Sequence, residues 1–169
     1  MNLKDTHVLI DTCIFNNLQS KQADLAQKTS TLLQSLVKNN NKLYFSEFTR
    51  YELLRDATKS KAAKIENSLN SFIEVHTTPS RIKRAPLLYS GYKKIPIIKG
   101  ILHSISDIDI FIGSLIFTEH RPLLLTSDYN DFPRPFFTEK SRKRIEFINK
   151  KNNLQSIYYY FLEADLESL

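Results

Sequence analysis

The sequence contains little glycine and cysteine and no long apolar run. With only three glycines in 169 residues, it has no glycine-rich loop of the kind that cradles nucleotide phosphates. A single cysteine, Cys13, excludes an internal disulfide framework and a cysteine-rich zinc site. No apolar stretch approaches the roughly 18 residues that span a bilayer, and the first ten residues are too polar for a signal peptide. A soluble, cytoplasmic domain is therefore expected.

Positive charge is present in excess, and it is concentrated. The chain has 24 basic and 18 acidic residues, a formal net charge of +6. Residues 76–106 include six basic residues and no acidic one, and residues 134–151 include seven basic and two acidic residues. Such stretches suit a polyanion such as nucleic acid, because bound cations release condensed counterions, although a solvated lysine-rich surface explains them equally well. The candidate nucleic-acid contacts are Arg81, Lys83, Arg84, Lys93, Lys94, Arg142, Lys143 and Arg144.

Short apolar runs alternate with helical patterns along the chain. This alternation predicts an α/β fold in three layers (α/β/α), with a central parallel sheet of about five strands. The expected strands are residues 7–10, 43–45, 72–76, 122–126 and 155–162. The expected helices lie within residues 14–38, after 46, and at 60–74, 108–119 and 138–151. We expect one domain over residues 1–169, with a basic insert at about 77–105 that contains one or two short helices.

Four acidic residues occupy positions that a parallel α/β sheet brings together. Asp11 directly follows the apolar strand HVLI, and Asp128 follows the strand LLLTS. Glu52 and Asp109 are expected in the first turns of helices. Because the carboxyl ends of parallel strands and the amino ends of the following helices open onto the same edge, these four side chains can converge.

Clustered carboxylates repel one another and do not stay ionised together without a cation. Oxygen ligands without a nearby set of histidines or cysteines favour Mg²⁺ or Mn²⁺ over zinc. The four histidines show no spacing that suggests a metal or base role. A divalent ion at this edge would neutralise charge on a phosphate and lower the pKa of a bound water, which predicts hydrolysis of a phosphodiester.

Four segments of the sequence together resemble the motifs of the PIN-domain nuclease family. They are LIDTCIF around Asp11, SEFTRYELL around Glu52, DIDIFIGSLIF with Asp109, and LLLTSDYNDF with Asp128. The resemblance extends from residue 7 to about residue 161. It implies a PIN-like fold and a Mg²⁺ or Mn²⁺ site formed by Asp11, Glu52, Asp109 and Asp128, with Thr126 near the site and Asp131 as a fifth acid.

Many small members of this family resemble VapC, the toxin ribonuclease of a toxin–antitoxin pair. The resemblance therefore implies an RNA substrate, a small antitoxin partner that blocks the site, and a homodimer. The basic insert is longer than in a minimal toxin of this kind, which leaves the class of substrate open. Two rival functions also stay open: a non-catalytic nucleic-acid-binding or scaffolding module, and a metal-dependent phosphatase or phosphotransferase with Asp11 as nucleophile. The second usually requires another aspartate two residues later, where this chain has Cys13.

Each candidate acid also has a purely structural interpretation. Asp11 could cap the helix that follows it, Asp109 could interact with a helix dipole, and Glu52 could form an ordinary surface ion pair. Asp128 suits a turn, and Asp131 could hold the loop before residue 132.

Other residues near these motifs are expected to be structural. We expect Thr12 and Ser46 to act as caps, and Ser106 or Asp107 to cap the helix that contains Asp109. Cys13 is expected to be a small buried hydrophobe. The aromatic run at 158–161 is expected in the sheet core rather than on a base-stacking surface.

Overall fold

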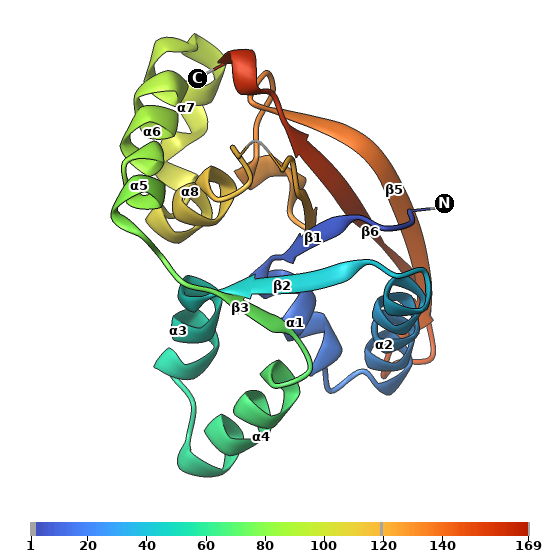
Figure 1. Cartoon of the computed structure of the whole chain (residues 1–169). Helices are drawn as coiled ribbons and strands as arrows, with labels where there is room; N and C mark the ends of the chain where they lie inside the picture. The colour runs from blue at the N-terminus through green and yellow to red at the C-terminus, as the bar shows by residue number, and fades with distance from the viewer. Residues whose placement is uncertain (1–2, 119, 169) are drawn as a thin grey trace.

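The computed structural model describes residues 3–118 and 120–168 and has one six-stranded sheet at its centre (Figure 1). The strand order is β3-β2-β1-β4-β6-β5. Four strands run parallel, and they are β1 (His7–Ile10), β2 (Lys42–Ser46), β3 (Ile73–Val75) and β4 (Leu123–Thr126). Two long strands, β5 (Phe137–Ile148) and β6 (Leu154–Ala164), form an antiparallel hairpin that joins the sheet through β6 and β4. The predicted central parallel sheet is present as β3-β2-β1-β4. The fifth predicted strand, at 155–162, is antiparallel and β5 adds a sixth, so the whole sheet is mixed.

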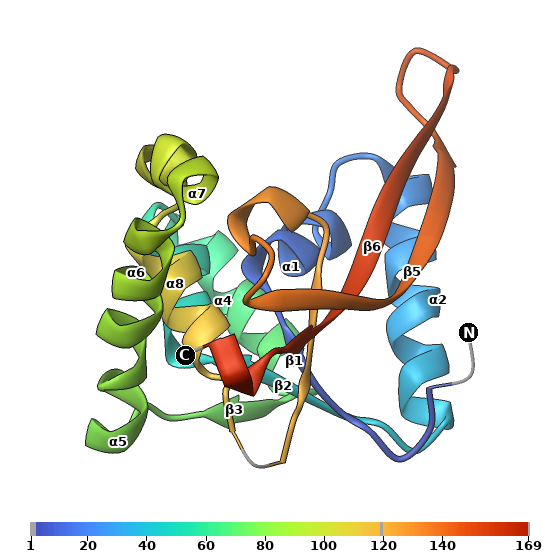
Figure 2. The ribbon, with the colours of Figure 1, turned by 90° about the horizontal axis from the view of Figure 1, so that it is seen from above.

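Helices cover both faces of the sheet, as the three-layer prediction requires (Figures 1 and 2). One side has α1 (Thr12–Leu18), α2 (Ala23–Lys38), α3 (Glu47–Arg55) and α4 (Lys59–Leu69). The other side has α5 (Pro79–Ile82), α6 (Arg84–Lys94), α7 (Pro96–Ile101) and α8 (Asp107–Ser114). Three short 3₁₀ turns complete the elements, and they are η1 (Leu102–Ser104), η2 (Tyr129–Asp131) and η3 (Leu166–Ser168). None of the described helices is long and apolar enough to cross a membrane.

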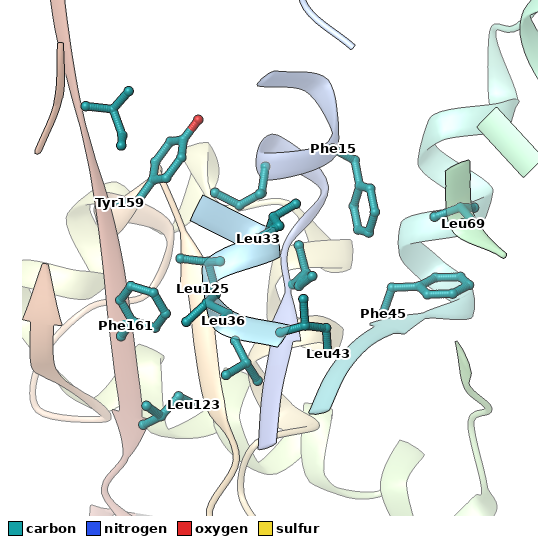
Figure 3. Packing of buried hydrophobic residues seen from close by; sticks show 14 of the residues in the cluster. Phe15, Leu33, Leu36, Leu43, Phe45, Leu69, Leu123, Leu125, Tyr159 and Phe161 are labelled. Atoms are coloured by element: carbon teal, nitrogen blue, oxygen red, sulfur yellow. The ribbon is translucent and has the colours of Figure 1, made fainter. Parts of the chain in front are cut away.

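Successive residues of the central strands point to opposite faces of the sheet and so into two separate hydrophobic cores. In β1, Val8 and Ile10 belong to the core on the α1–α4 side, whereas Leu9 belongs to the core on the α6–α8 side. In β4, Leu125 and Leu124 divide in the same way. Figure 3 shows the first core, in which aromatic and aliphatic side chains from the strands meet those of α1, α2 and α4. Burial on both faces explains why these strands have continuous apolar sequences.

The predicted basic helix at 138–151 is wrong, because this segment forms most of β5 and the turn after it. Ile145 and Phe147 are buried while the residues between and beside them are exposed, which is the two-residue period of a strand. Asn152 adopts a positive φ of 60° in the turn that joins β5 to β6, a conformation that asparagine tolerates well. The sequence INKKNN between two apolar alternating runs is thus a hairpin signal that the prediction overlooked.

The remaining predicted elements agree with the structure more closely. Ser46 caps α3 by accepting a hydrogen bond from the backbone N–H of Thr49. The basic stretch 77–105 forms three short α-helices instead of one or two, and Pro79 and Pro96 occupy the first turns of α5 and α7, where a missing N–H costs little. The helix expected at 108–119 ends at residue 114, and position 119 lies outside the described residues.

Candidate metal-binding active site

Asp11 lies at the carboxyl end of β1, and its side chain is 3 % exposed. One carboxylate oxygen accepts a hydrogen bond from the backbone N–H of Thr12 at 2.6 Å and so caps α1. The other oxygen accepts from the Thr126 hydroxyl at 2.7 Å and from the Cys13 thiol at 3.1 Å. Burial nevertheless raises the pKa of Asp11 to about 6, and these hydrogen bonds only partly oppose that rise.

The residues that hold Asp11 belong to a small network between β1 and β4. The backbone N–H of Asp128 donates to the Thr126 hydroxyl at 2.9 Å, which leaves that hydroxyl free to donate to Asp11. The backbone N–H of Ser127 donates to the Cys13 sulfur at 3.1 Å. The chain after β4 therefore fixes the orientation of the Asp11 carboxylate.

Asp109 lies in the first turn of α8 and takes part in a capping box. Its carboxylate accepts from the Ser106 hydroxyl at 2.6 Å and from the Ser106 backbone N–H at 3.1 Å, while the Ser106 hydroxyl accepts from the Asp109 N–H. Ser106, and not Asp107, is thus the cap of this helix. Burial, followed by the charge of Asp128, raises the pKa of Asp109 above its usual value, although the bonds to Ser106 oppose this.

Asp128 directly precedes the 3₁₀ turn η2 that follows β4, and Asp131 is the last residue of that turn. The pKa of Asp131 is raised to about 7, first by burial and then by the charges of Asp109, Asp128 and Asp11. The carboxyls of Asp11, Asp109, Asp128 and Asp131 therefore lie close enough for their charges to interact.

Glu52 contacts this group through Thr12. The Thr12 hydroxyl donates to a Glu52 carboxylate oxygen, and the Thr12 backbone N–H donates to Asp11. Glu52 is the sixth residue of α3, so its position in a first helical turn was predicted wrongly. The structure brings all five candidate acids to one edge of the sheet. Glu52 is linked to Asp11 through hydrogen bonds to Thr12, and the other four interact with one another through their charges.

The electrostatics of this cluster fit a divalent cation. Every charge that raises the pKa of Asp11, Asp109 or Asp131 is that of another carboxylate. The donor atoms on offer are carboxylate and hydroxyl oxygens, which suit Mg²⁺ or Mn²⁺. Within the described part of the chain, however, no three acidic, histidine or cysteine side chains already form a metal-binding arrangement. Asp109 is turned toward Ser106 and Glu52 toward Thr12.

A buried hydroxyl without a hydrogen-bond partner lies next to the acids. Tyr92 on α6 is fully buried, and its hydroxyl has no partner among the residues that the structure describes. Burial and the charges of Asp109 and Asp131 raise the pKa of Tyr92. A buried donor that lacks a hydrogen-bond partner costs roughly 1–3 kcal/mol. A ligand oxygen bound at the acidic cluster would remove this cost by accepting a hydrogen bond from the Tyr92 hydroxyl.

The predicted nucleic-acid contacts are spread over several parts of the molecule. Arg81 lines a cavity with His7 and His120. His7 is at the amino end of β1, whereas Asp11 is at its carboxyl end. Lys83 is exposed where α5 meets α6, and Arg84 begins α6. The others are Lys93 and Lys94 in the last turn of α6, and Arg142, Lys143 and Arg144, exposed on β5.

Sequence reasoning missed three positioning residues in this site. Thr12, Cys13 and Ser106 each bond to a candidate acid, although they were expected to serve as caps or core. Thr12 and Cys13 immediately follow Asp11, and Ser106 lies three residues before Asp109 in a capping-box spacing. That proximity was the available signal, and it could not show which atoms the side chains would contact.

The fold and the acidic edge together define an α/β domain of the PIN-like class. No family model and no curated protein sequence matches the chain. Among solved structures, a chain in the crystal structure of VapBC2 from Rickettsia felis bound to a DNA fragment from their promoter is similar, with a TM-score of 0.59. The match covers 75% of this chain and 91% of that chain at 18% identity. The predicted PIN-like three-layer fold is thereby confirmed, and at this identity the likeness concerns the fold.

Proposed function

We propose that this protein is a metal-dependent endoribonuclease that hydrolyses RNA phosphodiester bonds. The observation that carries the proposal is the group of mutually repelling carboxyls, Asp11, Asp109, Asp128 and Asp131, at one edge of a PIN-like sheet. Uncompensated charge of this kind destabilises a fold, and it is explained if the group serves to bind a cation.

Asp11 and Asp109, together with Glu52 and Asp128 directly or through waters, would hold Mg²⁺ or Mn²⁺. The ion would supply charge neutralisation at the phosphate and a water of lowered pKa. Thr126, Cys13 and the Thr12 N–H hold the Asp11 carboxylate in one orientation. Because Asp109 bonds to Ser106, it must exchange part of that capping box for the ion.

Two alternatives from the sequence are less well supported. A phosphotransferase with Asp11 as nucleophile usually requires another aspartate two residues later, but this chain has Cys13 there, and its thiol donates to Asp11. A non-catalytic nucleic-acid-binding module has one observation in its favour, the rotation of Glu52 and Asp109 toward protein partners. The charge repulsion that remains among the acids argues against it.

The likeness to a VapBC2 chain also supports an antitoxin partner for this protein. A cationic side chain of such a partner, an arginine or a lysine, would neutralise the acids as the metal does. The antitoxin would then compete with the metal ion for the acidic site and so block cleavage.

The test is cleavage of total RNA by the wild-type protein and by Asp11→Asn, each with EDTA, Mg²⁺ or Mn²⁺, followed by mapping of the new ends. We expect cuts by the wild type with metal only, and none by the variant. Equal cleavage by both proteins, or cleavage in EDTA, would contradict the proposal. Binding of RNA by both without any cleavage would favour the non-catalytic module.

A further inference from the structure

Three tyrosines form a continuous row that begins beside the acids and continues along the β5–β6 hairpin. This row, called here the tyrosine strip, consists of Tyr129 in η2 and Tyr160 and Tyr158 in β6. The rings of Tyr129 and Tyr160 stack, with centroids 5.0 Å apart and planes inclined by 25°. The centroids of Tyr160 and Tyr158 are 6.3 Å apart, with an inclination of 33°.

Each end of the tyrosine strip has an arginine beside it. The guanidinium carbon of Arg134 lies 5.9 Å from the Tyr129 ring centroid, and its Nε donates to the Tyr129 hydroxyl at 2.7 Å. The guanidinium carbon of Arg142 lies 5.5 Å from the Tyr158 centroid. Arg144 pairs directly with Tyr158 across the hairpin and therefore points to the same face. A row of aromatic rings with cationic side chains beside it is the combination by which proteins bind single-stranded nucleic acid.

The ion pairs of these arginines leave them available to a phosphate. Arg142 is 3.7 Å from Glu139 and Arg144 is 2.9 Å from Glu146, and both arginine side chains are more than half exposed. Exposed ion pairs of this kind contribute little to stability. Replacing the carboxylate partner of Arg142 or Arg144 by a phosphate oxygen therefore costs little free energy.

The hairpin presents the tyrosine strip rigidly. Its opposite face is buried, because Tyr159 and Phe161 belong to the core and the Tyr159 hydroxyl lies 2.7 Å from that of Thr29 on α2. Asp24 of α2 accepts from the backbone N–H of Ile148 near the tip at 2.7 Å. Tyr158 is 38 % exposed, and Figure 2 shows the hairpin extending beyond the helices, with α2 alongside it.

The tyrosine strip leads directly to the acidic cluster. Tyr160 pairs with Thr126 across β6 and β4, and Thr126 donates to Asp11. Tyr129 lies between Asp128 and Asp131 in the sequence. A polymer that follows the tyrosines therefore arrives at the proposed site of hydrolysis.

We infer that the tyrosine strip binds unpaired nucleotides of an RNA strand and guides that strand to the carboxylates. The inference rests on the proposed nuclease function and adds the substrate class, single-stranded RNA. Bases stack on Tyr158 and its neighbours while Arg142 and Arg144 contact phosphates. A duplex is excluded, because its bases already stack on one another and leave no face for the tyrosines. The seven basic and two acidic residues of 134–151 favour a polyanion over a protein as the occupant.

Binding is measured by fluorescence anisotropy with a labelled 12-nucleotide oligouridine and a 12-base-pair RNA duplex. The background protein is Asp11→Asn in EDTA, so that no cleavage can occur. Tyr158→Ala is compared with Tyr158→Phe, which keeps the ring, and with Tyr89→Ala. Tyr89 is an equivalent control, because it is also 38 % exposed and has Lys93 4.2 Å from its ring centroid, but it lies on α6.

The expected result is that the background protein prefers the single strand. Tyr158→Ala should weaken that binding by about tenfold, while Tyr158→Phe and Tyr89→Ala stay within about twofold. Arg142→Gln should lower the slope of log affinity against log salt by roughly 0.7, whereas Tyr158→Ala should leave the slope unchanged. Circular dichroism of each variant checks that it folds.

Three results would overturn the inference. They are equal affinity for single strand and duplex, unchanged binding in Tyr158→Ala, or an equal loss in the Tyr89 and Tyr158 variants. Unchanged binding in Tyr158→Ala would point to a protein as the occupant of the tyrosine strip. The nuclease proposal is tested separately, by cleavage with the wild-type protein and Mg²⁺. If Tyr158→Ala leaves RNA binding unchanged while the wild type cuts RNA with Mg²⁺, only the role of the tyrosine strip is refuted. If Tyr158→Ala weakens RNA binding but the wild type cuts no RNA with any metal, only the nuclease proposal is refuted.

Discussion

Two groups of charged side chains in this protein differ in their charge neighbours: one pairs acids with an arginine, and the other places acids beside acids. On the α3–α4 side, Arg50 binds Glu74 through two hydrogen bonds of 2.8 and 3.0 Å and also pairs with Glu66. Its positive charge lowers the pKa of Glu74. At the acidic edge, by contrast, burial and then the charges of neighbouring carboxylates raise the pKa of Asp11 to about 6 and that of Asp131 to about 7. The first group stabilises the protein, whereas the second stores repulsion that a ligand can relieve.

Loss of Asp11 should produce the largest effect on activity. We expect Asp11→Asn to lower the rate of metal-dependent RNA cleavage by about 100-fold or more, because it removes the buried carboxylate at the centre of the network. The rate is measured under single-turnover conditions with a labelled single strand. Asp56→Asn is the control, since Asp56 is exposed and pairs only with its neighbour Arg55. A variant that retains more than a tenth of the activity would contradict the proposed role.

The metal-free protein should lose stability as the pH rises from 5 to 7.5. The folded-state pKa values of Asp11 and Asp131 exceed 3.8, the ordinary value for an aspartate, so the folded protein binds these protons more tightly than the unfolded chain. Their contribution is present at low pH and is lost as the pH passes through about 6 and 7. At roughly 1.4 kcal/mol per pH unit for each group, the two carboxyls together give about 4 kcal/mol. Solvent screening at the half-buried Asp131 lowers the expected fall to about 2–3 kcal/mol.

This pH dependence is measured by urea unfolding in EDTA. Addition of Mg²⁺ at pH 7.5 should restore the lost stability, because the ion binds the ionised carboxylates of the folded state. In Asp11→Asn both the fall and the restoration should be smaller. Stability that rises over this pH range without metal would show that the carboxylates are compensated by some other charge.

Disruption of the compensated group should reduce stability without affecting the metal response. Arg50→Ala leaves Glu66 and Glu74 facing each other without a cation, and we expect it to lower the free energy of unfolding by about 2 kcal/mol. Arg55→Ala, which breaks only an exposed ion pair, should change stability by less than about 0.5 kcal/mol. If Arg50→Ala altered the stabilisation by Mg²⁺, the two charged groups would not be independent.

The smallest expected effect concerns Thr126. Its hydroxyl donates to Asp11 and lowers the pKa of that carboxyl, so Thr126→Val should raise this pKa further. For a hydrogen bond worth about 1 kcal/mol, the acidic limb of the pH–rate profile moves to higher pH by roughly 0.7 unit. Thr126→Ser keeps the hydroxyl and should keep the profile. An unshifted profile in the valine variant would mean that Asp11 does not set this limb.

The central part of the fold could be predicted because its sequence signals are local. The buried strand before Asp11 is continuous and apolar, and Ser46 caps its helix with its own side chain. The carboxyl ends of β1 and β4 carry Asp11 and Asp128 in any parallel sheet, so the meeting of these residues follows from topology. The same argument applies to Asp109 at the start of α8.

The hairpin could not be assigned from local charge. Lysines and arginines of β5 occur at a density typical of a solvated helix, and only the pairing with β6 gives them a two-residue period. All of residues 158–161 were expected in the core, yet only Tyr159 and Phe161 are buried, whereas Tyr160 is half-buried against the core on the α6–α8 side and Tyr158 is exposed. The orientation of Asp109 toward Ser106 is likewise beyond prediction, because it depends on a balance of a few hydrogen bonds.

The acidic edge is tested most directly by titrating the metal-free protein with Mn²⁺ at pH 7.5. The concentration of free Mn²⁺ is monitored by electron paramagnetic resonance. The wild type should remove Mn²⁺ from solution saturably, and Asp11→Asn should remove far less at the same protein concentration. If the two proteins bind Mn²⁺ equally, or neither does, the clustered carboxyls have some purpose other than holding a divalent ion.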